Sequence, residues 1–275
     1  QINMFSALGV APPSYAHLPM ILGSDGAKLS KRHGAVDIRN YYEQGFLPEA
    51  MLNYLVRLGW SCGDQEIFSI KEMIRYFDIS DVNHSASSFN PEKLLWINQQ
   101  HIINSSSEDL GLALIPFMQK INIDTTNGPE LMEIAVAYKE RAETLFQMAN
   151  DARYCFEDFN EIDTKAAKKN LRPVILKPLK AIRDALFTLQ PWEKSAIAET
   201  IEEVAKSFEI KMGKIGQPIR VAITGGSVSP PIDMVLMLVG KDKSIERLDF
   251  AIRLIEARSI QDVDYNDNNS ARSTP

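Results

Sequence analysis

The spacing of apolar residues in the second half of the chain constrains the fold most. Between residues 131 and 148 apolar side chains recur every three or four positions, as on one face of a helix. Similar spacing predicts helices at 165–170, 174–189, 193–208, 219–224, 232–239 and 244–257. No segment there shows the two-residue alternation of a half-buried strand. We therefore expect a mainly α protein in which residues 105–258 form an all-helical bundle, followed by a disordered tail at 259–275 that is rich in Asn, Asp and Ser.

The first half contains shorter helices with identifiable starts. Four start signals occur, namely Asp37, Pro48, the capping box Ser69-x-x-Glu72 and Asn90-Pro91. In the helix after Pro48, the apolar residues expected to face a core are Met51, Leu52, Leu55, Val56 and Leu58. The polar stretch Asn104-Ser105-Ser106-Ser107 reads as a hinge. It predicts a domain boundary between residues 104 and 105.

Residues 19–35, PMILGSDGAKLSKRHGA, combine a short apolar run with a basic loop. The run Met20-Ile21-Leu22 ends in turn residues, which predicts the end of a strand. Lys28, Lys31 and Arg32 then place three positive charges within five residues, with glycines on both sides. A loop of this kind can bend around a compact anion such as a polyphosphate. The alternative is a basic surface loop that binds nothing.

Bulk composition excludes several classes of protein. The chain has 275 residues, 45% of them hydrophobic, which suffices for the cores of two domains. No apolar run of about eighteen residues occurs, and the first ten residues do not resemble a signal peptide. Cys62 and Cys155 lie far apart, which favours a reducing compartment and no structural metal site. We expect a cytoplasmic protein that does not bind membranes.

Positive charge is unevenly distributed although the net charge is −6. One basic cluster consists of Lys165, Lys168, Lys169, Arg172, Lys177, Lys180 and Arg183, and a second of Lys206, Lys211, Lys214 and Arg220. Such asymmetry suits an RNA contact on one face. The alternative, that these side chains only solvate outer helix faces, is equally open at this point.

The order of residues in the basic loop resembles a known signature. Lys28-Leu29-Ser30-Lys31-Arg32 is similar to the KMSKS motif of class I aminoacyl-tRNA synthetases, in the form found in bacterial glutamyl-tRNA synthetases, where Arg replaces the last Ser. The flanking segments 15–19, 33–35, 47–55 and 58–60 resemble the same family in the same order. The resemblance extends to about residue 258.

This resemblance implies a domain plan. Residues 1–35 would be the end of a Rossmann-type catalytic fold, 36–104 a helical stem-contact domain, and 105–258 the all-helical anticodon-binding domain of the family. The family's other catalytic signature, HIGH, does not occur in the sequence. The chain therefore resembles a C-terminal portion of the enzyme, and we expect it alone to catalyse neither half-reaction.

The family pattern also implies roles for the loop. Lys31 and Lys28 would be the catalytic cations, and Lys31, Lys28 and Ser30 would bind ATP. A preorganised ammonium near the β- and γ-phosphates stabilises the charge that develops as pyrophosphate leaves. The substrates would be ATP with Mg²⁺, glutamate, whose pocket would lie mostly outside this chain, and tRNA-Glu.

The segments 212–225 and 228–231 resemble the family's anticodon pocket. Arg220 can donate a fork of hydrogen bonds to a base or a phosphate, and Ser229, Pro230 and Ile232 match positions that line the pocket. An intra-bundle salt bridge is the structural alternative for Arg220. Pro231 stands where the family usually has Gly, which changes the local backbone.

We therefore interpret the chain as a monomeric portion of a glutamyl-tRNA synthetase that carries the KMSKS loop and binds tRNA-Glu through its acceptor-stem side and anticodon. The competing hypothesis is a non-catalytic helical module that binds RNA or protein and whose basic loop is incidental. The two differ in whether tRNA binding depends on salt and on the anticodon.

Overall fold

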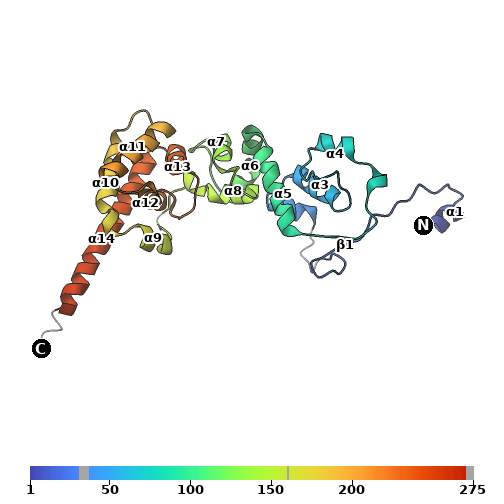
Figure 1. Cartoon of the computed structure of the whole chain (residues 1–275), viewed down its shortest axis with the longest axis horizontal. Coiled ribbons are helices and arrows are strands. Elements are labelled where there is room, and N and C mark those ends of the chain that lie inside the picture. Colours follow the sequence, from blue (N-terminus) through green and yellow to red (C-terminus); the bar gives the residue numbers. More distant parts are fainter. Residues whose placement is uncertain (31–36, 160, 271–275) are drawn as a thin grey trace. The chain divides into compact units, whose positions relative to one another are not determined.

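The computed structural model describes residues 1–30, 37–159 and 161–270, with side chains described up to residue 258. The chain divides into two compact units, Gln1–Asn104 and Ser105–Pro275 (Figure 1). The division falls in the polar Asn104–Ser107 stretch. We call these the N-terminal and C-terminal units.

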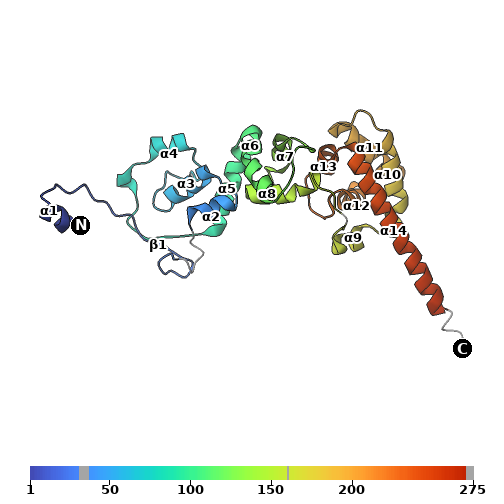
Figure 2. The same ribbon diagram turned by 180° about the vertical axis from the view of Figure 1, so that it is seen from behind.

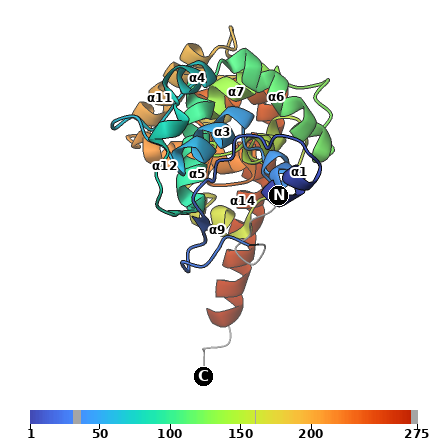
Figure 3. The same cartoon turned by 90° about the vertical axis from the view of Figure 1, so that its right-hand side faces the viewer.

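The N-terminal unit consists of short helices and two very short strands. Its elements are α1 (Ile2–Ala7), β1 (Ile21–Leu22), α2 (Ile38–Glu43), α3 (Pro48–Arg57), α4 (Ile70–Tyr76), the 3-10 helix η2 (Ile79–Asp81), β2 (Ser87–Ser88) and α5 (Pro91–Asn104). β1 and β2 pair in parallel, with Ile21 opposite Ser87. Figure 3 shows α3 between α4 and α5, and α3 packs against both helices.

The predicted helix starts are confirmed. The carboxylate of Asp37 accepts a hydrogen bond from Arg39 N at 3.0 Å, and Pro48 occupies the first position of α3. Ser69 and Glu72 form both bonds of the capping box. The side chains of Asp37 and Ser69 satisfy amide groups that the first helical turn leaves unpaired, whereas Pro48 has no amide proton to satisfy.

The buried face of α3 differs from the predicted one. Met51 is buried, but Leu52 and Leu55 are 49% and 44% exposed. Asn53 lies in the core instead, because its Oδ1 accepts from Phe68 N at 2.8 Å and its Nδ2 donates to Glu66 O at 3.0 Å. A polar residue whose side-chain oxygen and nitrogen are both hydrogen-bonded is thus buried in the core, and a search for apolar periodicity cannot identify it.

Among the residues that the structure describes, the C-terminal unit contains helices and no strand, as the sequence predicts. Its α-helices are α6 (Ser107–Lys120), α7 (Leu131–Tyr138), α8 (Leu145–Asp151), α9 (Thr164–Asn170), α10 (Leu176–Thr188), α11 (Lys194–Ser207), α12 (Met212–Thr224), α13 (Ile232–Val239) and α14 (Lys241–Ser270), with 3-10 turns η3 (Arg153–Cys155) and η4 (Pro173–Ile175). α12 packs against α9, α10, α11, α13 and α14 (Figure 1). Its residues Ile215, Ile219 and Ala222 are fully buried.

The single helix predicted for residues 131–148 is wrong, because the structure has two. α7 ends at Tyr138, and α8 begins after Thr144, whose hydroxyl accepts from Gln147 N at 3.1 Å. The hydroxyl of Tyr138 donates to Asp151 O at 2.8 Å and lies 2.9 Å from the hydroxyl of Tyr154. These contacts join the end of α8 to the end of α7, and the apolar spacing continues across the non-helical segment between the two helices.

α14 also extends further than predicted. Its backbone is helical to Ser270, beyond the other helices of its unit (Figure 2), where the sequence suggests an irregular tail from residue 259. Residues 259–270 contain neither Pro nor Gly, so no residue there forces the helix to end. None of the helices that the structure describes is both long and apolar enough to cross a bilayer.

Candidate nucleic-acid interface

The basic loop starts from a small hairpin in the N-terminal unit. Leu29 N donates to Ile21 O at 2.9 Å, and Gly23 N donates to Ala27 O at 2.8 Å. The carboxylate of Asp25 accepts from Ala27 N at 2.9 Å and tightens the turn. Lys28 and Ser30 are both exposed beside this hairpin. Lys31, Arg32 and His33 lie outside the described residues.

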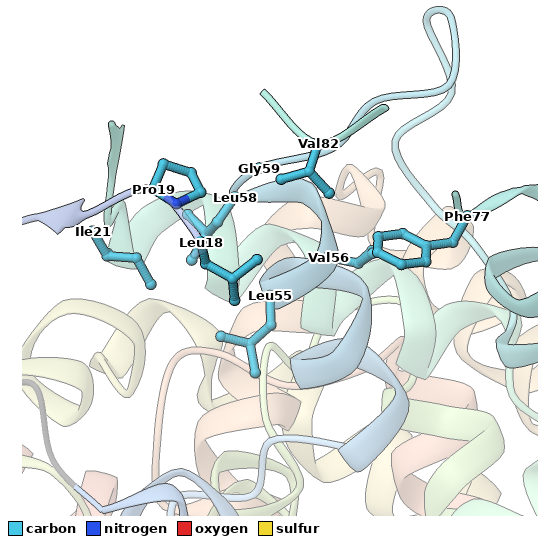
Figure 4. Close-up of a pocket in the computed structure, with 9 residues that line it drawn as sticks. All are labelled: Leu18, Pro19, Ile21, Leu55, Val56, Leu58, Gly59, Phe77 and Val82. Atoms are coloured by element: carbon cyan, nitrogen blue, oxygen red, sulfur yellow. The ribbon is translucent and has the colours of Figure 1, made fainter. Parts of the chain in front are cut away.

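An apolar pocket of about 180 Å³ lies behind the segment that leads into this hairpin. Figure 4 shows Leu18 and Leu55 pointing toward each other, with Pro19 above Leu58. The other lining residues are Ile21, Val56, Gly59, Phe77 and Val82. The apolar lining of this pocket does not suit a phosphate. Leu55 lines the pocket, which explains why its side chain does not lie on the buried face of α3.

The structure brings three of the four predicted anticodon residues together in the C-terminal unit. Arg220 lies on α12, and Nε of its guanidinium donates to Ser229 Oγ at 2.7 Å. Nη2 of Arg220 donates to Pro230 O at 3.4 Å. The Ser229 hydroxyl in turn donates to Pro230 O at 2.9 Å. The loop between α12 and α13 therefore fixes the direction of the Arg220 side chain.

Ile232 occupies a different place in this arrangement. It is the first residue of α13 and is half-buried. Pro231 precedes it as the N-cap residue of α13, and its carbonyl oxygen accepts a hydrogen bond from Val235 N at 3.0 Å. A proline thus fits the start of this helix, and the substitution of the family's usual Gly is accommodated.

Arg220 has no carboxylate partner among the described residues, so the salt bridge considered as its structural role is not formed there. Partial burial lowers the pKa of Arg220, and the nearby positive charge of Arg141 lowers that pKa further. An arginine remains cationic at neutral pH despite such shifts. The charge of Arg141 thus lies near that of Arg220, and neither arginine forms an ion pair among the described residues, an arrangement that favours an anionic or base-edge ligand.

The end of α12 is held by a neighbouring segment. Gly225 ends the helix in the left-handed region at φ +72°, which Gly adopts without strain. Asp163 N donates to Gly225 O at 2.9 Å. A cavity of about 370 Å³ opens beside this turn. Its lining residues are Asn150, Asp151, Arg153, Tyr154, Glu157, Asp158, Phe159, Glu161, Thr224, Gly225, Gly226 and Val228.

Family models match both units. Residues 1–96 match the catalytic domain of class I tRNA synthetases of the E and Q type, and residues 109–252 match an anticodon-binding domain. Together with the relatives described next, these matches decide the family. The chain belongs to the glutamyl-tRNA synthetase family.

Several glutamate–tRNA ligases resemble the chain. Glutamate–tRNA ligase 1 of Alkalilimnicola ehrlichii is 49% identical over 259 residues, which cover 94% of this chain and 55% of that protein. Glutamate–tRNA ligase 2 of Coxiella burnetii is 49% identical over 93% of this chain and 54% of its own length. A glutamate–tRNA ligase structure from Elizabethkingia meningosepticum matches with a TM-score of 0.79 and 30% identity, over 92% of this chain and 54% of that chain. The chain therefore spans about half the length of the curated relatives it matches.

The sequence did not indicate Arg141 as a residue near the candidate anticodon site of this synthetase family. It lies in the acidic stretch 130–143, where nothing in the local pattern distinguishes it from a solvating side chain. Only the fold places its charge near Arg220. Among the described residues, no three or more His, Cys, Asp or Glu side chains gather into a group that could hold a metal ion.

Proposed function

We propose that the chain binds the anticodon loop of tRNA-Glu through Arg220 and the Ser229-Pro230 turn, as part of a cytoplasmic glutamate–tRNA ligase. The observation that carries this proposal is the state of Arg220, a half-buried cation held by neutral acceptors and paired with no acid among the described residues. Unpaired bases of an RNA loop are read by stacking and by hydrogen bonds to their edges. A fixed guanidinium is suited to such a contact.

Arg247 of the same unit shows what a purely structural arginine looks like. Its Nη1 donates to Ile223 O at 2.8 Å, and its Nη2 donates to Glu157 O at 2.9 Å and Asp158 Oδ1 at 3.2 Å. Arg220 differs because its Nη1 has no acceptor within the described part of the chain. Donors remain available on Arg220 for a ligand, which supports the proposed role.

The test is equilibrium binding of the chain to tRNA-Glu and to the same tRNA with a changed anticodon. Arg220→Ala should weaken tRNA-Glu binding by about tenfold to a hundredfold, the usual cost of one lost base contact, and affect the changed tRNA little. Arg183→Ala is the control, because Arg183 is already bound to Asp249 at 2.8 Å. Equal losses for both tRNAs in Arg220→Ala would contradict anticodon reading and indicate a phosphate contact or a structural role.

The loop that includes Lys28 supports a second part of the proposal. In the complete ligase, Lys31 stabilises the β- and γ-phosphates as glutamate displaces pyrophosphate, while Lys28 adds a second cation and Ser30 a hydroxyl donor. Mg²⁺ enters this reaction bound to ATP. The support is the family resemblance together with the hairpin that presents Lys28 and Ser30 to solvent.

Pyrophosphate exchange in a complete ligase containing this sequence tests the loop. Lys31→Ala should lower tRNA-dependent exchange by about a hundredfold to a thousandfold, the usual loss for one donor to a transition-state charge. Affinity for tRNA-Glu should change little. Normal exchange rates in this variant would contradict the assignment of Lys31.

A further inference from the structure

The structure contains a basic groove next to the Arg220 site. Two adjoining hollows of about 500 Å³ each share Lys169, Asn170 and Gln217 in their lining. The groove lies between α9, η4 and the first turn of α12, and its four cations are Lys165, Lys169, Arg172 and Lys214. We call these four residues the groove cations. They come from both basic clusters of the sequence, which the fold joins here.

Ion pairs neutralise some of the other basic residues of the two clusters, although Lys168, Lys177 and Lys211 also form none within the described part of the chain. Ion pairs engage Lys180 with Glu256 at 2.6 Å, Arg183 with Asp249 at 2.8 Å and Lys206 with Glu202 at 2.8 Å. The groove cations are exposed and form no ion pair within the described part of the chain. Their charge is therefore available to an external anion.

The rest of the groove lining opposes an anion only weakly. Asp163 is the one carboxylate among the lining residues, and its Oδ1 already accepts from Ala166 N at 2.7 Å as the cap of α9. Gly213 and Lys214 belong to the first turn of α12, which has no side-chain cap. The partial positive charge of that turn adds to the groove cations.

The groove is continuous with the candidate anticodon site. Lys214, Gln217 and Arg220 follow one another at three-residue intervals, which places them on neighbouring turns of one side of α12. Ser227 lines the groove, and Gly226 and Val228 on either side of it line the cavity beside the end of α12. The cavity itself contains Asp151, Glu157, Asp158 and Glu161 in its lining. A polyanion bound at Arg220 would therefore reach the groove along α12, where no acidic residue lies between Lys214 and Arg220.

We infer that the groove cations bind the sugar-phosphate backbone of the same tRNA, next to its anticodon loop. This inference rests on the proposed function. An RNA backbone fits because it presents a series of phosphates along a path, whereas a compact phosphate ligand would need cations converging on one point. Backbone contacts of this kind add affinity and position the RNA but do not read its sequence.

The test measures how binding of tRNA-Glu depends on salt for two matched double variants. Lys169→Gln with Lys214→Gln removes two groove cations, and Lys180→Gln with Lys206→Gln removes two exposed, ion-paired lysines. Both change the net charge of the chain equally. The groove variant should lower the slope of log K against log salt by about one per lysine, with equal loss of affinity for tRNA-Glu and the anticodon-changed tRNA. The control variant should keep the slope of the unaltered chain.

The outcomes separate this inference from the proposed function. If the unaltered chain binds tRNA-Glu selectively but the groove variant keeps its slope, the groove does not contact the RNA, as expected if it serves an acidic protein. Equal loss of slope in both variants would reduce the effect to net charge and overturn the inference. If the unaltered chain shows neither selective nor salt-dependent binding, the proposed function fails and this inference with it.

Discussion

The acceptors within reach of an arginine decide what that residue can do. In the C-terminal unit Arg247 is 7% exposed and bound to the backbone of two segments, so its charge serves the fold. Arg220 is held by Ser229 and Pro230 with donors left over. Its environment keeps a cation in place without neutralising it, which is a feature expected of a ligand-binding residue.

Ser229 should affect tRNA binding indirectly, because it holds the Arg220 side chain in position. Ser229→Ala removes the acceptor that lies 2.7 Å from Arg220 Nε, so the guanidinium gains freedom that binding must remove. We expect the preference for tRNA-Glu over an anticodon-changed tRNA to fall by about threefold to tenfold, the worth of one typical hydrogen bond. Binding titrations with both tRNAs measure it. Ser229→Thr keeps an acceptor and should retain most of the preference, whereas an unchanged preference in Ser229→Ala would contradict this role.

His101 should make the stability of the N-terminal unit depend on pH. Its Nε2 lies 2.9 Å from Asn53 Oδ1, and burial lowers the pKa of His101 below its ordinary value of 6.5, with Glu49 opposing the shift. The unfolded chain therefore binds a proton more readily than the folded one, and stability should fall as the pH drops below about 6.5. Hydrogen exchange at the Phe68 amide, which donates to Asn53, reports this opening.

Two variants serve as checks on the His101 prediction. His101→Gln should remove the loss of Phe68 protection between neutral and mildly acidic pH, after correction for intrinsic exchange rates. His84→Gln changes an exposed histidine and should leave the loss of Phe68 protection at acidic pH unchanged. The same pH dependence in His101→Gln as in the unaltered chain would show that another group is responsible.

At the scale of elements, the contact between α6 and α7 depends on the absence of a side chain. A Cβ on Gly111 would lie 2.8 Å from Met132 N, closer than real Cβ contacts. Gly216 in α12 has open space at the same position. Alanine is more favourable than glycine inside a helix by about 1 kcal/mol. A comparison of alanine substitutions at Gly111 and Gly216 therefore separates the effect of helix propensity from that of close packing.

Gly111→Ala and Gly216→Ala should therefore have opposite effects. We expect Gly111→Ala to lower the free energy of unfolding by about 1–3 kcal/mol, the usual cost of overpacking, despite its better helix propensity. Gly216→Ala should raise it by about 0.5–1 kcal/mol. Urea unfolding of both variants measures the difference. A stabilising Gly111→Ala would mean that α6 and α7 can move apart at little cost.

Arg247 connects α14 to the end of α12 and to the segment that follows η3. Arg247→Met keeps much of the side-chain volume but leaves the carbonyl oxygens of Ile223 and Glu157 without their donor. We expect a loss of about 1–3 kcal/mol in unfolding free energy, the cost of buried unpaired groups. Arg253→Met on the exposed side of α14 is the control and should cost much less. Similar losses in the two variants would contradict the connecting role.

Local signals in the sequence predicted elements better than breaks between them. The caps at Asp37 and Ser69 act within a few residues, so sequence alone identifies the helix starts that they form. The break between α7 and α8 depends instead on Tyr138 reaching Asp151 and Tyr154, which are brought close only by folding. The resemblance to a known family was sufficient to single out Arg220 and Ser229. It could not predict that Arg220 has no carboxylate partner among the described residues or that Arg141 lies near it, because both depend on the fold.

At the scale of the whole molecule, the proposed RNA binding by the C-terminal unit occurs in a chain with a net charge of −6. Ion pairs neutralise Lys180, Arg183 and Lys206 of α10 and α11, and the groove cations form no ion pair among the described residues beside the Arg220 site. An uneven distribution of charge therefore allows an acidic protein to bind a polyanion.

Equilibrium binding of the purified chain to tRNA-Glu, beside an anticodon-changed tRNA and at two salt concentrations, tests the central claim most directly. We expect tighter binding of tRNA-Glu at both salt concentrations and a steep loss of affinity for both tRNAs at the higher one, because phosphate contacts release counterions. Equal affinity for the two tRNAs, or affinity that does not change with salt, would contradict the account.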